Sequence, residues 1–136
     1  MSRVIVNVDG GARGNPGPAA IGVVVRDADG KVLEELGERI GETTNNVAEY
    51  RALLRGIELA GALGATELEL IGDSELVVRQ VEGRYKVKNA GMKELHAEAK
   101  RALADFDSWS ISHVRRAENA DADRLVNQAL DGVLDG

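Results

Sequence analysis

Cysteine and long hydrophobic runs are both missing from this chain of 136 residues. The lack of cysteine excludes disulfide bonds and metal sites built on thiolates, and it agrees with a reducing compartment. No stretch approaches the ~20 apolar residues that span a bilayer, and no N-terminal apolar run resembles a signal peptide. We therefore expect a soluble cytoplasmic protein with no membrane partner.

A surplus of positive charge is also missing, since the formal net charge is −6. Nucleic-acid-binding proteins usually carry a basic face, so this sum argues at first against such a partner. The basic residues nevertheless gather in two places, Arg84, Lys86, Lys88 and Lys93 in one and Arg115 and Arg116 in the other. A solvated surface is the simpler interpretation of both groups.

Length and composition fit one compact domain, because 136 residues with 43% hydrophobic content can bury a sizeable core. No repeat, low-complexity segment or linker interrupts the chain. We expect a single domain over residues 1–136 that is a monomer.

Residues 4–17 combine a strand with a glycine-rich stretch. β-Branched residues alternate up to Val8, as in a pleated strand, and Asp9 follows at the strand's end. A buried carboxylate there needs a cation or a shifted pKa. The glycines that follow, in a loop, are Gly10, Gly11, Gly14 and Gly17. Two interpretations stay open: a site for a metal and a phosphodiester, or a β-hairpin with a glycine-rich turn.

The hydrophobic pattern predicts the element order βββαβααβα. Strands are expected at residues 4–9, 21–26, 31–40, 67–72 and 109–114, and helices at 47–63, 75–81, 92–106 and 120–133. A turn at 27–30 makes the first three strands an antiparallel meander, and the strand at 67–72 is a candidate parallel neighbour of the first. We expect an α/β fold with a five-stranded mixed sheet and helices on both faces.

Four acidic positions fall at element ends or in first helical turns: Asp9, Glu49, Asp73 and one of Asp121 or Asp123. Each has a structural explanation when taken singly. Glu49 can favour a helix N-terminus through the dipole, and Asp73 can cap the helix that follows. Helical spacing does not separate Asp121 from Asp123, which lie on opposite borders of an apolar stripe.

Four motifs occur in order at domain-scale spacing. They are DGGARGNPGP at 9–18, TTNNVAE at 43–49, GDS at 72–74 and NADAD at 119–123. Together they resemble the type 1 ribonuclease H family, and the resemblance covers nearly the whole chain. The predicted element order agrees with the ribonuclease H-like fold.

The resemblance implies an endoribonuclease that hydrolyses the RNA strand of RNA–DNA hybrids and leaves 5′-phosphate and 3′-hydroxyl ends. Asp9, Glu49, Asp73 and Asp123 match the four metal-ligating carboxylates, which selects Asp123 over Asp121. Two Mg²⁺ ions, or Mn²⁺ as a substitute, would offset the repulsion among these hard oxygen ligands. Asp9 is the candidate to bridge both ions.

The resemblance also implies the contacts with substrate. The residues expected to reach nucleic acid are Gly10, Gly11, Ala12, Asn15, Arg26, Thr44, Asn45, Asn46, Lys86 and Lys88. Residues 10–12 and the three asparagines would read 2′-hydroxyl groups in the minor groove. Thr44, Asn15 and Arg26 resemble a pocket for a DNA phosphate. Asn45 and Asn46 can instead cap the helix that begins nearby.

Two further residues are candidates for a catalytic role. His113 lies ten residues before Asp123, where many family members have a histidine that aids proton transfer or product release. A structural role in the last strand is an equally simple explanation. Arg116, seven residues before Asp123, matches a functional arginine in a variant of the family, and we favour it slightly. His96 has no predicted role in chemistry.

The chain departs from the better-known bacterial form between Gly83 and Met92, where it lacks the long basic handle that grips the hybrid. Lys86 and Lys88 are what remains, so we do not expect salt-resistant binding. Double-stranded RNA becomes a further candidate substrate. Because some bacteria fuse this domain to a C-terminal partner, a whole protein and an excised domain both stay open.

Three rival functions remain. Intact carboxylates at all four positions weigh against a non-catalytic hybrid-binding domain. The paired motifs at 9–18 and 43–49 weigh against another nuclease or transferase of the wider superfamily. The absence of a Gly-Lys-Ser/Thr motif weighs against a small-molecule phosphate hydrolase.

Overall fold

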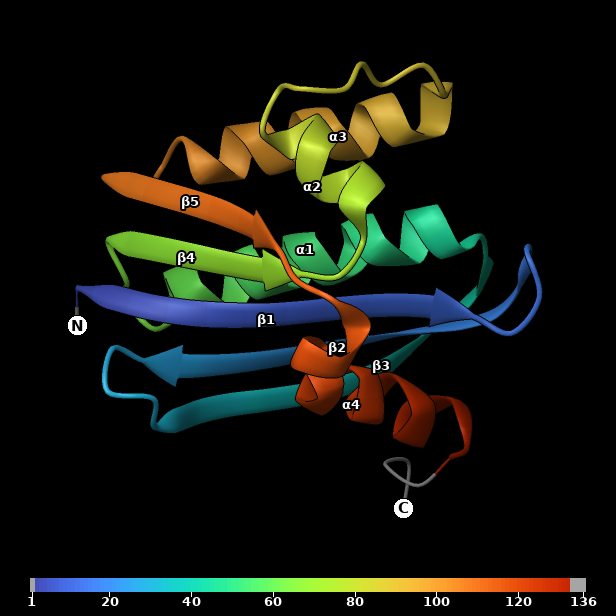
Figure 1. Cartoon of the computed structure of the whole chain (residues 1–136), viewed down its shortest axis with the longest axis horizontal. Coiled ribbons are helices and arrows are strands. Elements are labelled where there is room, and N and C mark those ends of the chain that lie inside the picture. Colours follow the sequence, from blue (N-terminus) through green and yellow to red (C-terminus); the bar gives the residue numbers. More distant parts are fainter. Residues whose placement is uncertain (1, 133–136) are drawn as a thin grey trace.

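The structure, a computed structural model, describes residues 2–132 and has the predicted element order with one added 3₁₀ helix (Figure 1). The strands are β1 (Arg3–Ala12), β2 (Gly17–Asp27), β3 (Val32–Thr43), β4 (Glu67–Gly72) and β5 (Ser108–His113). The helices are α1 (Asn45–Ala62), α2 (Glu75–Val81), α3 (Ala90–Leu103), the 3₁₀ helix η1 (Arg116–Asn119) and α4 (Ala120–Leu130). The predicted α/β class is confirmed.

The five strands form one mixed sheet in the order β3-β2-β1-β4-β5. β1 and β2 pair antiparallel, as do β2 and β3, whereas β1 with β4 and β4 with β5 are parallel. The antiparallel meander and the parallel neighbour of the first strand are both confirmed. β1 is the central strand of the sheet, so its valines are buried, and it carries Asp9.

Helices α1 and α4 cover opposite faces of the sheet, as predicted (Figure 1). Gly56 lets α1 approach closely, since a Cβ atom there would lie 2.9 Å from the side chains of Val6 and Val8. On the other face, a Cβ atom at Gly22 of β2 would overlap the carbonyl of Ala122 in α4. Glycine at both crossings therefore sets how near the helices come to β1 and β2.

The glycine-rich stretch differs from the prediction, because most of it is strand. Gly10 pairs with Ile21 and Ala12 with Ala19, so β1 continues three residues past Asp9. The turn is confined to residues 13–16, where Gly14 has a φ of +110°. The stretch forms a hairpin with Asp9 inside its first strand, and a metal site at Asp9 is compatible with this hairpin. Residues 10–12 are strand because they pair with residues 19–21 of β2, and local turn propensity does not predict that pairing.

Other boundaries shift by a few residues. β2 begins four residues earlier than predicted, and β3 ends three residues later. α1 begins at Asn45 because the Thr44 side chain accepts a hydrogen bond from the Val47 amide. α3 begins at Ala90 because Asn89 caps it in the same way, and it ends at Leu103. α4 ends at Leu130, and its predicted last residue, Val133, lies outside the described residues.

None of the helices within residues 2–132 combines the length and apolar character needed to cross a membrane.

Candidate active site

Asp9, Glu49 and Asp73 lie together, and we call them the carboxylate cluster. β1 and β4 are parallel and Val8 pairs with Gly72, so the next residues, Asp9 and Asp73, stand side by side. One carboxylate oxygen from each of the three residues lies within 4.8 Å of the others. Three acidic side chains from β1, α1 and the end of β4 therefore meet at one point.

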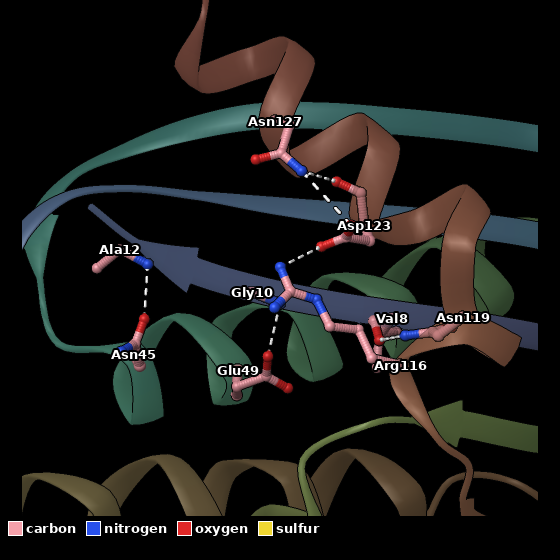
Figure 2. Close-up of polar contacts among 9 residues, drawn as sticks. All are labelled: Val8, Gly10, Ala12, Asn45, Glu49, Arg116, Asn119, Asp123 and Asn127. Atoms are coloured by element: carbon pink, nitrogen blue, oxygen red, sulfur yellow. Dashed lines mark hydrogen bonds and ion pairs between the residues drawn. The ribbon is translucent and has the colours of Figure 1, made fainter. Parts of the chain in front are cut away.

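Gly10 fixes the place of Glu49. Its amide donates a hydrogen bond of 3.0 Å to Glu49 Oε1 (Figure 2). A Cβ atom at Gly10 would overlap the carbonyl of Ala48, the residue before Glu49. The absence of a side chain at this position lets α1 rest on the β1 backbone and brings Glu49 beside Asp9.

Asp123 faces the carboxylate cluster from α4. Arg116 Nη2 lies 3.2 Å from Asp123 Oδ1, and Asn127 Nδ2 donates to the backbone carbonyl of Asp123 at 3.1 Å (Figure 2). Asp121 instead forms an ion pair with Arg26 at 2.6 Å. The packing of α4 thus separates the two acids that helical spacing left equivalent.

A cavity of about 530 Å³ opens over these residues. All four predicted carboxylates line it, together with Arg116. The backbone of Gly10, Gly11 and Ala12 forms part of its wall, beside Asn45 and Asn46. Acidic side chains and bare backbone therefore share one open cavity.

The electrostatics of the cavity favour bound cations. Burial, followed by repulsion from Glu49, Asp73 and Asp123, raises the pKa of Asp9 well above its ordinary value. Burial also raises the pKa of Glu49 to about 7, against the opposing hydrogen bonds from Asp9 and the Gly10 amide. A positive charge nearby would favour the ionised form of both carboxyls. Hard oxygen donors in such a group suit Mg²⁺ or Mn²⁺.

Comparison with known proteins agrees with this geometry. A family model described as "Reverse transcriptase-like" matches residues 7–129. The "Ribonuclease H" of Erythrobacter litoralis is 34% identical over 145 residues, which cover 96% of this chain and 98% of that protein. This chain belongs to the ribonuclease H family. The predicted family and the ribonuclease H-like fold are both confirmed.

Two relatives with higher identity are longer than this chain. The "Ribonuclease HI" of Halobacterium salinarum is 46% identical over 95% of this chain and 65% of its own length. The "Bifunctional protein Rv2228c" of Mycobacterium tuberculosis is 48% identical over 96% of this chain and 36% of its own length. The chain thus spans about two thirds and one third of these curated relatives.

Solved ribonuclease H structures superpose on nearly the whole chain. The crystal structure of RNase H1 from Halobacterium salinarum has a TM-score of 0.94 at 45% identity, covering 96% of this chain and 98% of that one. LC11-RNase H1, crystallised with an RNA/DNA hybrid, has a TM-score of 0.91 at 47% identity, covering 96% and 99%.

Among the predicted nucleic-acid contacts of this ribonuclease H family member, Asn15 and Asn45 hold the β1–β2 turn against α1. Asn15 Oδ1 accepts from the Asn45 amide at 3.0 Å, and Asn45 Oδ1 accepts from the Ala12 amide at 2.8 Å. Thr44 caps α1 from the adjacent position. Lys86 and Lys88 are exposed and lie outside the cavity lining.

Arg26 does not belong with Thr44 and Asn15, so the predicted phosphate pocket of these three residues is wrong. Arg26 pairs with Val32 near one end of β2, whereas Gly17 pairs with Thr43 at the other. Nine residues of strand separate the two ends, or about 30 Å. The Arg26 guanidinium binds Asp121 and Asn7 Oδ1. Only the family resemblance placed these three residues together, because the local sequence does not determine the register of β2 on β3.

Of the two candidate catalytic residues, Arg116 lines the cavity and His113 is not among its lining residues. His113 is the last residue of β5 and pairs with Gly72 of β4. Arg116 is the first residue of η1, which leads directly into α4 and Asp123. Its guanidinium supplies positive charge to Asp123, and the same attraction raises the pKa of Arg116.

Asn119 is a site residue that the sequence analysis did not single out. It is 1% exposed and donates a hydrogen bond of 2.8 Å to the carbonyl of Val8, next to Asp9 (Figure 2). Its Oδ1 accepts from Asn7 Nδ2 at 3.0 Å. These bonds tie the start of α4 to β1. The sequence offered one indication of this role, because Asn119 is the first residue of the motif at 119–123.

Proposed function

We propose that this chain is a ribonuclease H that hydrolyses the RNA strand of RNA–DNA hybrids at internal positions. The observation that carries the proposal is the meeting of Asp9, Glu49 and Asp73 within 4.8 Å, in a cavity that Asp123 also lines. Such a group of acids is costly to assemble without a cationic ligand. The bare backbone beside it leaves room for a nucleic-acid backbone.

The donor set fits two divalent metal ions. Asp9, Glu49, Asp73 and Asp123 would hold them, and their hard oxygens favour Mg²⁺, with Mn²⁺ as a substitute. When bound, the ions would activate the attacking water and neutralise charge on the departing 3′ oxygen, giving 5′-phosphate and 3′-hydroxyl ends.

The remaining cavity residues would bind and orient the hybrid. The backbone of residues 10–12 would lie against the minor groove of the hybrid, and the side-chain amides of Asn45 and Asn46 would bind the 2′-hydroxyls that distinguish RNA from DNA. The amides of Gly10 and Ala12 already donate to Glu49 and Asn45. The Arg116 guanidinium, held at Asp123, would attract the scissile phosphate. Lys86 and Lys88 would contact phosphates farther from the cleaved bond.

The relatives support this substrate. Proteins named "Ribonuclease HI" and "Ribonuclease H" match this chain over most of its length, and LC11-RNase H1 crystallised with an RNA/DNA hybrid. The cleavage of hybrids by this chain is inferred from that likeness together with the acidic cavity.

The decisive experiment incubates end-labelled RNA–DNA hybrid with the protein in Mg²⁺, Mn²⁺ or chelator. The Asp9→Asn variant serves as the test, and Asp121→Asn is its matched control because Asp121 faces Arg26 instead of the cavity. Metal-dependent internal cuts in RNA alone, lost only in Asp9→Asn, are expected. Binding without cutting would indicate a hybrid-binding domain, and equal cutting of DNA would indicate another nuclease.

Double-stranded RNA belongs in the same assay as a second substrate, since the chain lacks the handle of the bacterial form. The monomeric state and the cytoplasmic location stay predictions. Light scattering tests the first, and imaging of the tagged protein in its own cell tests the second.

A further inference from the structure

Gln80 is a buried polar residue that the catalytic cavity does not use. The described residues contain three buried polar or charged side chains: Asp9, Asn119 and Gln80. Asp9 lines the cavity and Asn119 binds the carbonyl of Val8 beside it, whereas Gln80, on α2, is 4% exposed and contacts neither. A buried amide is costly unless its oxygen and nitrogen both find partners. The partners of Gln80 therefore indicate what it is for.

Those partners come from three different parts of the chain. Gln80 Oε1 accepts a hydrogen bond of 2.6 Å from the hydroxyl of Tyr50, which is fully buried in α1. Gln80 Nε2 donates to the backbone carbonyl of Lys86 at 3.4 Å. The backbone carbonyl of Gln80 lies 3.1 Å from His96 Nε2 of α3. Gln80 thus joins α1, α3 and the connection between α2 and α3.

That connection, residues 82–89, is a basic segment without helix or strand (Figure 1). Its first residues are held because the amides of Arg84 and Tyr85 donate to the Arg79 carbonyl at 2.8 and 3.2 Å. Its last residue, Asn89, caps α3. Between these ends, the Gln80 side chain binds the backbone at Lys86, the middle of the exposed cations Arg84, Lys86 and Lys88.

Gln80 is also linked to two carboxylates of the active site. Tyr50, which holds Gln80, follows Glu49 directly on α1, and Glu49 is bound to the Gly10 amide. α2, which carries Gln80, begins immediately after Asp73 and its cap Ser74. A short covalent and hydrogen-bonded path therefore joins two of the clustered carboxylates to the backbone of Lys86.

We propose that Gln80 is a positioning residue for substrate. Its hydrogen bond to the Lys86 carbonyl holds the basic segment, residues 82–89, in a fixed position relative to the carboxylate cluster. Lys86 and Lys88 are therefore already ordered when they bind substrate phosphates. Pre-ordering lowers the entropic cost of binding. This inference rests on the proposed hydrolysis of hybrid, and it concerns affinity for the substrate and not the chemical step.

The first test is steady-state cleavage of hybrid by Gln80→Met, which keeps the side-chain volume and removes both hydrogen bonds. KM should rise about five-fold with kcat unchanged, the scale of one lost hydrogen bond. Tyr50→Phe, which loses only the hydroxyl, should shift KM in the same direction. Gln128→Met, the same change at the chain's other glutamine on α4, should leave both constants unaltered.

A double-mutant cycle separates positioning from general stability. If Gln80 acts through the basic segment, adding Gln80→Met to Lys86→Ala should raise KM much less than Gln80→Met does alone. Additive effects on KM, a loss confined to kcat, or no effect of Lys86→Ala would each overturn the proposal.

Hydrogen exchange of the protein without substrate gives a readout that does not depend on catalysis. Gln80→Met should speed exchange in residues 82–89 while β1 and β4 stay protected. Unchanged exchange in this segment would overturn the inference. If the wild-type protein failed to cleave hybrid, the proposed function would fall, yet this measurement would still decide whether Gln80 holds the segment.

Discussion

Gly10 is the residue at which backbone geometry and catalytic chemistry are most directly joined. Its amide binds Glu49, and its Cα faces the α1 backbone so closely that a methyl group would overlap the Ala48 carbonyl. The Ala48 carbonyl belongs to the main chain, so it cannot move aside as a flexible side chain would. A substitution here must therefore displace α1 or β1.

Gly10→Ala should destabilise the fold by about 1–3 kcal/mol, the usual range for overpacking, and should move Glu49 away from Asp9. We expect lower cleavage activity in Mg²⁺ together with a lower midpoint of denaturant unfolding. Gly11→Ala is the matched control for the unfolding measurement, because its Cβ would meet only Val126 at an ordinary 3.6 Å. The comparison of the two variants therefore rests on the unfolding midpoint. Equal effects of the two substitutions would contradict this account.

Arg116 and His113 differ in where their side chains can act. Arg116 lines the cavity and pairs with Asp123, so Arg116→Ala should lower kcat by about a hundred-fold through loss of a charged group at the phosphate. His113→Ala should change kcat much less. Steady-state cleavage of hybrid measures kcat for both variants, and a larger loss in His113→Ala would reverse the assignment.

Among the elements, η1 and α4 need a connection to the sheet, because α4 supplies Asp123 from the face opposite α1 (Figure 1). The Asn119 side chain provides it by binding the Val8 carbonyl and Asn7. Arg26 adds to this connection by donating a hydrogen bond to Asn7, whereas its ion pair with the exposed Asp121 contributes little. The position of α4 on the sheet therefore depends on a small polar network as well as on the apolar cluster that Val126 and Ala129 form with Ala20 of β2.

Asn119→Ala should cost about 1–3 kcal/mol, because it leaves buried polar partners without a hydrogen bond. Activity should fall as well, since Asp123 is displaced with the start of α4. Urea unfolding and hybrid cleavage are the measurements. Glu118→Ala, which removes only an exposed ion pair with Arg115 from the same 3₁₀ helix, should change neither. A stable, fully active Asn119→Ala protein would contradict this role.

At the scale of the whole molecule, the carboxylate cluster opposes folding when no cation is bound. The pKa values of Asp9 and Glu49 are raised in the folded state, so folding retains protons that the unfolded chain releases. Their contribution to stability is full below the unfolded pKa values and is lost as pH rises through the folded ones.

The free energy of unfolding of the metal-free protein should therefore decline between about pH 4.5 and pH 7, the interval over which Glu49 ionises in the unfolded but not the folded state. Excess Mg²⁺ should restore stability, and its effect should grow toward pH 7 because the metal competes with protons. Thermal unfolding with chelator and with Mg²⁺ measures this. An Asp9→Asn variant should show a weaker pH dependence, and stability that rises steadily over this interval would contradict it.

The sequence by itself determined the element order and the four acids that line the cavity. Alternating valines and helical stripes report which local conformation buries apolar groups, and that preference needs no knowledge of distant residues. Motif spacing then singled out Asp9, Glu49, Asp73 and Asp123 through their resemblance to a family, and the structure brings all four to one cavity.

The tertiary structure alone decided which polar residues are neighbours. The pairing of β1 with β2 carried the strand past Asp9, and the register of β2 on β3 separated Arg26 from Thr44. The packing of α4 turned Asp123 toward the cavity and Asp121 toward Arg26. Strand register and helix rotation depend on contacts between segments far apart in the chain, so local pattern carries no record of them.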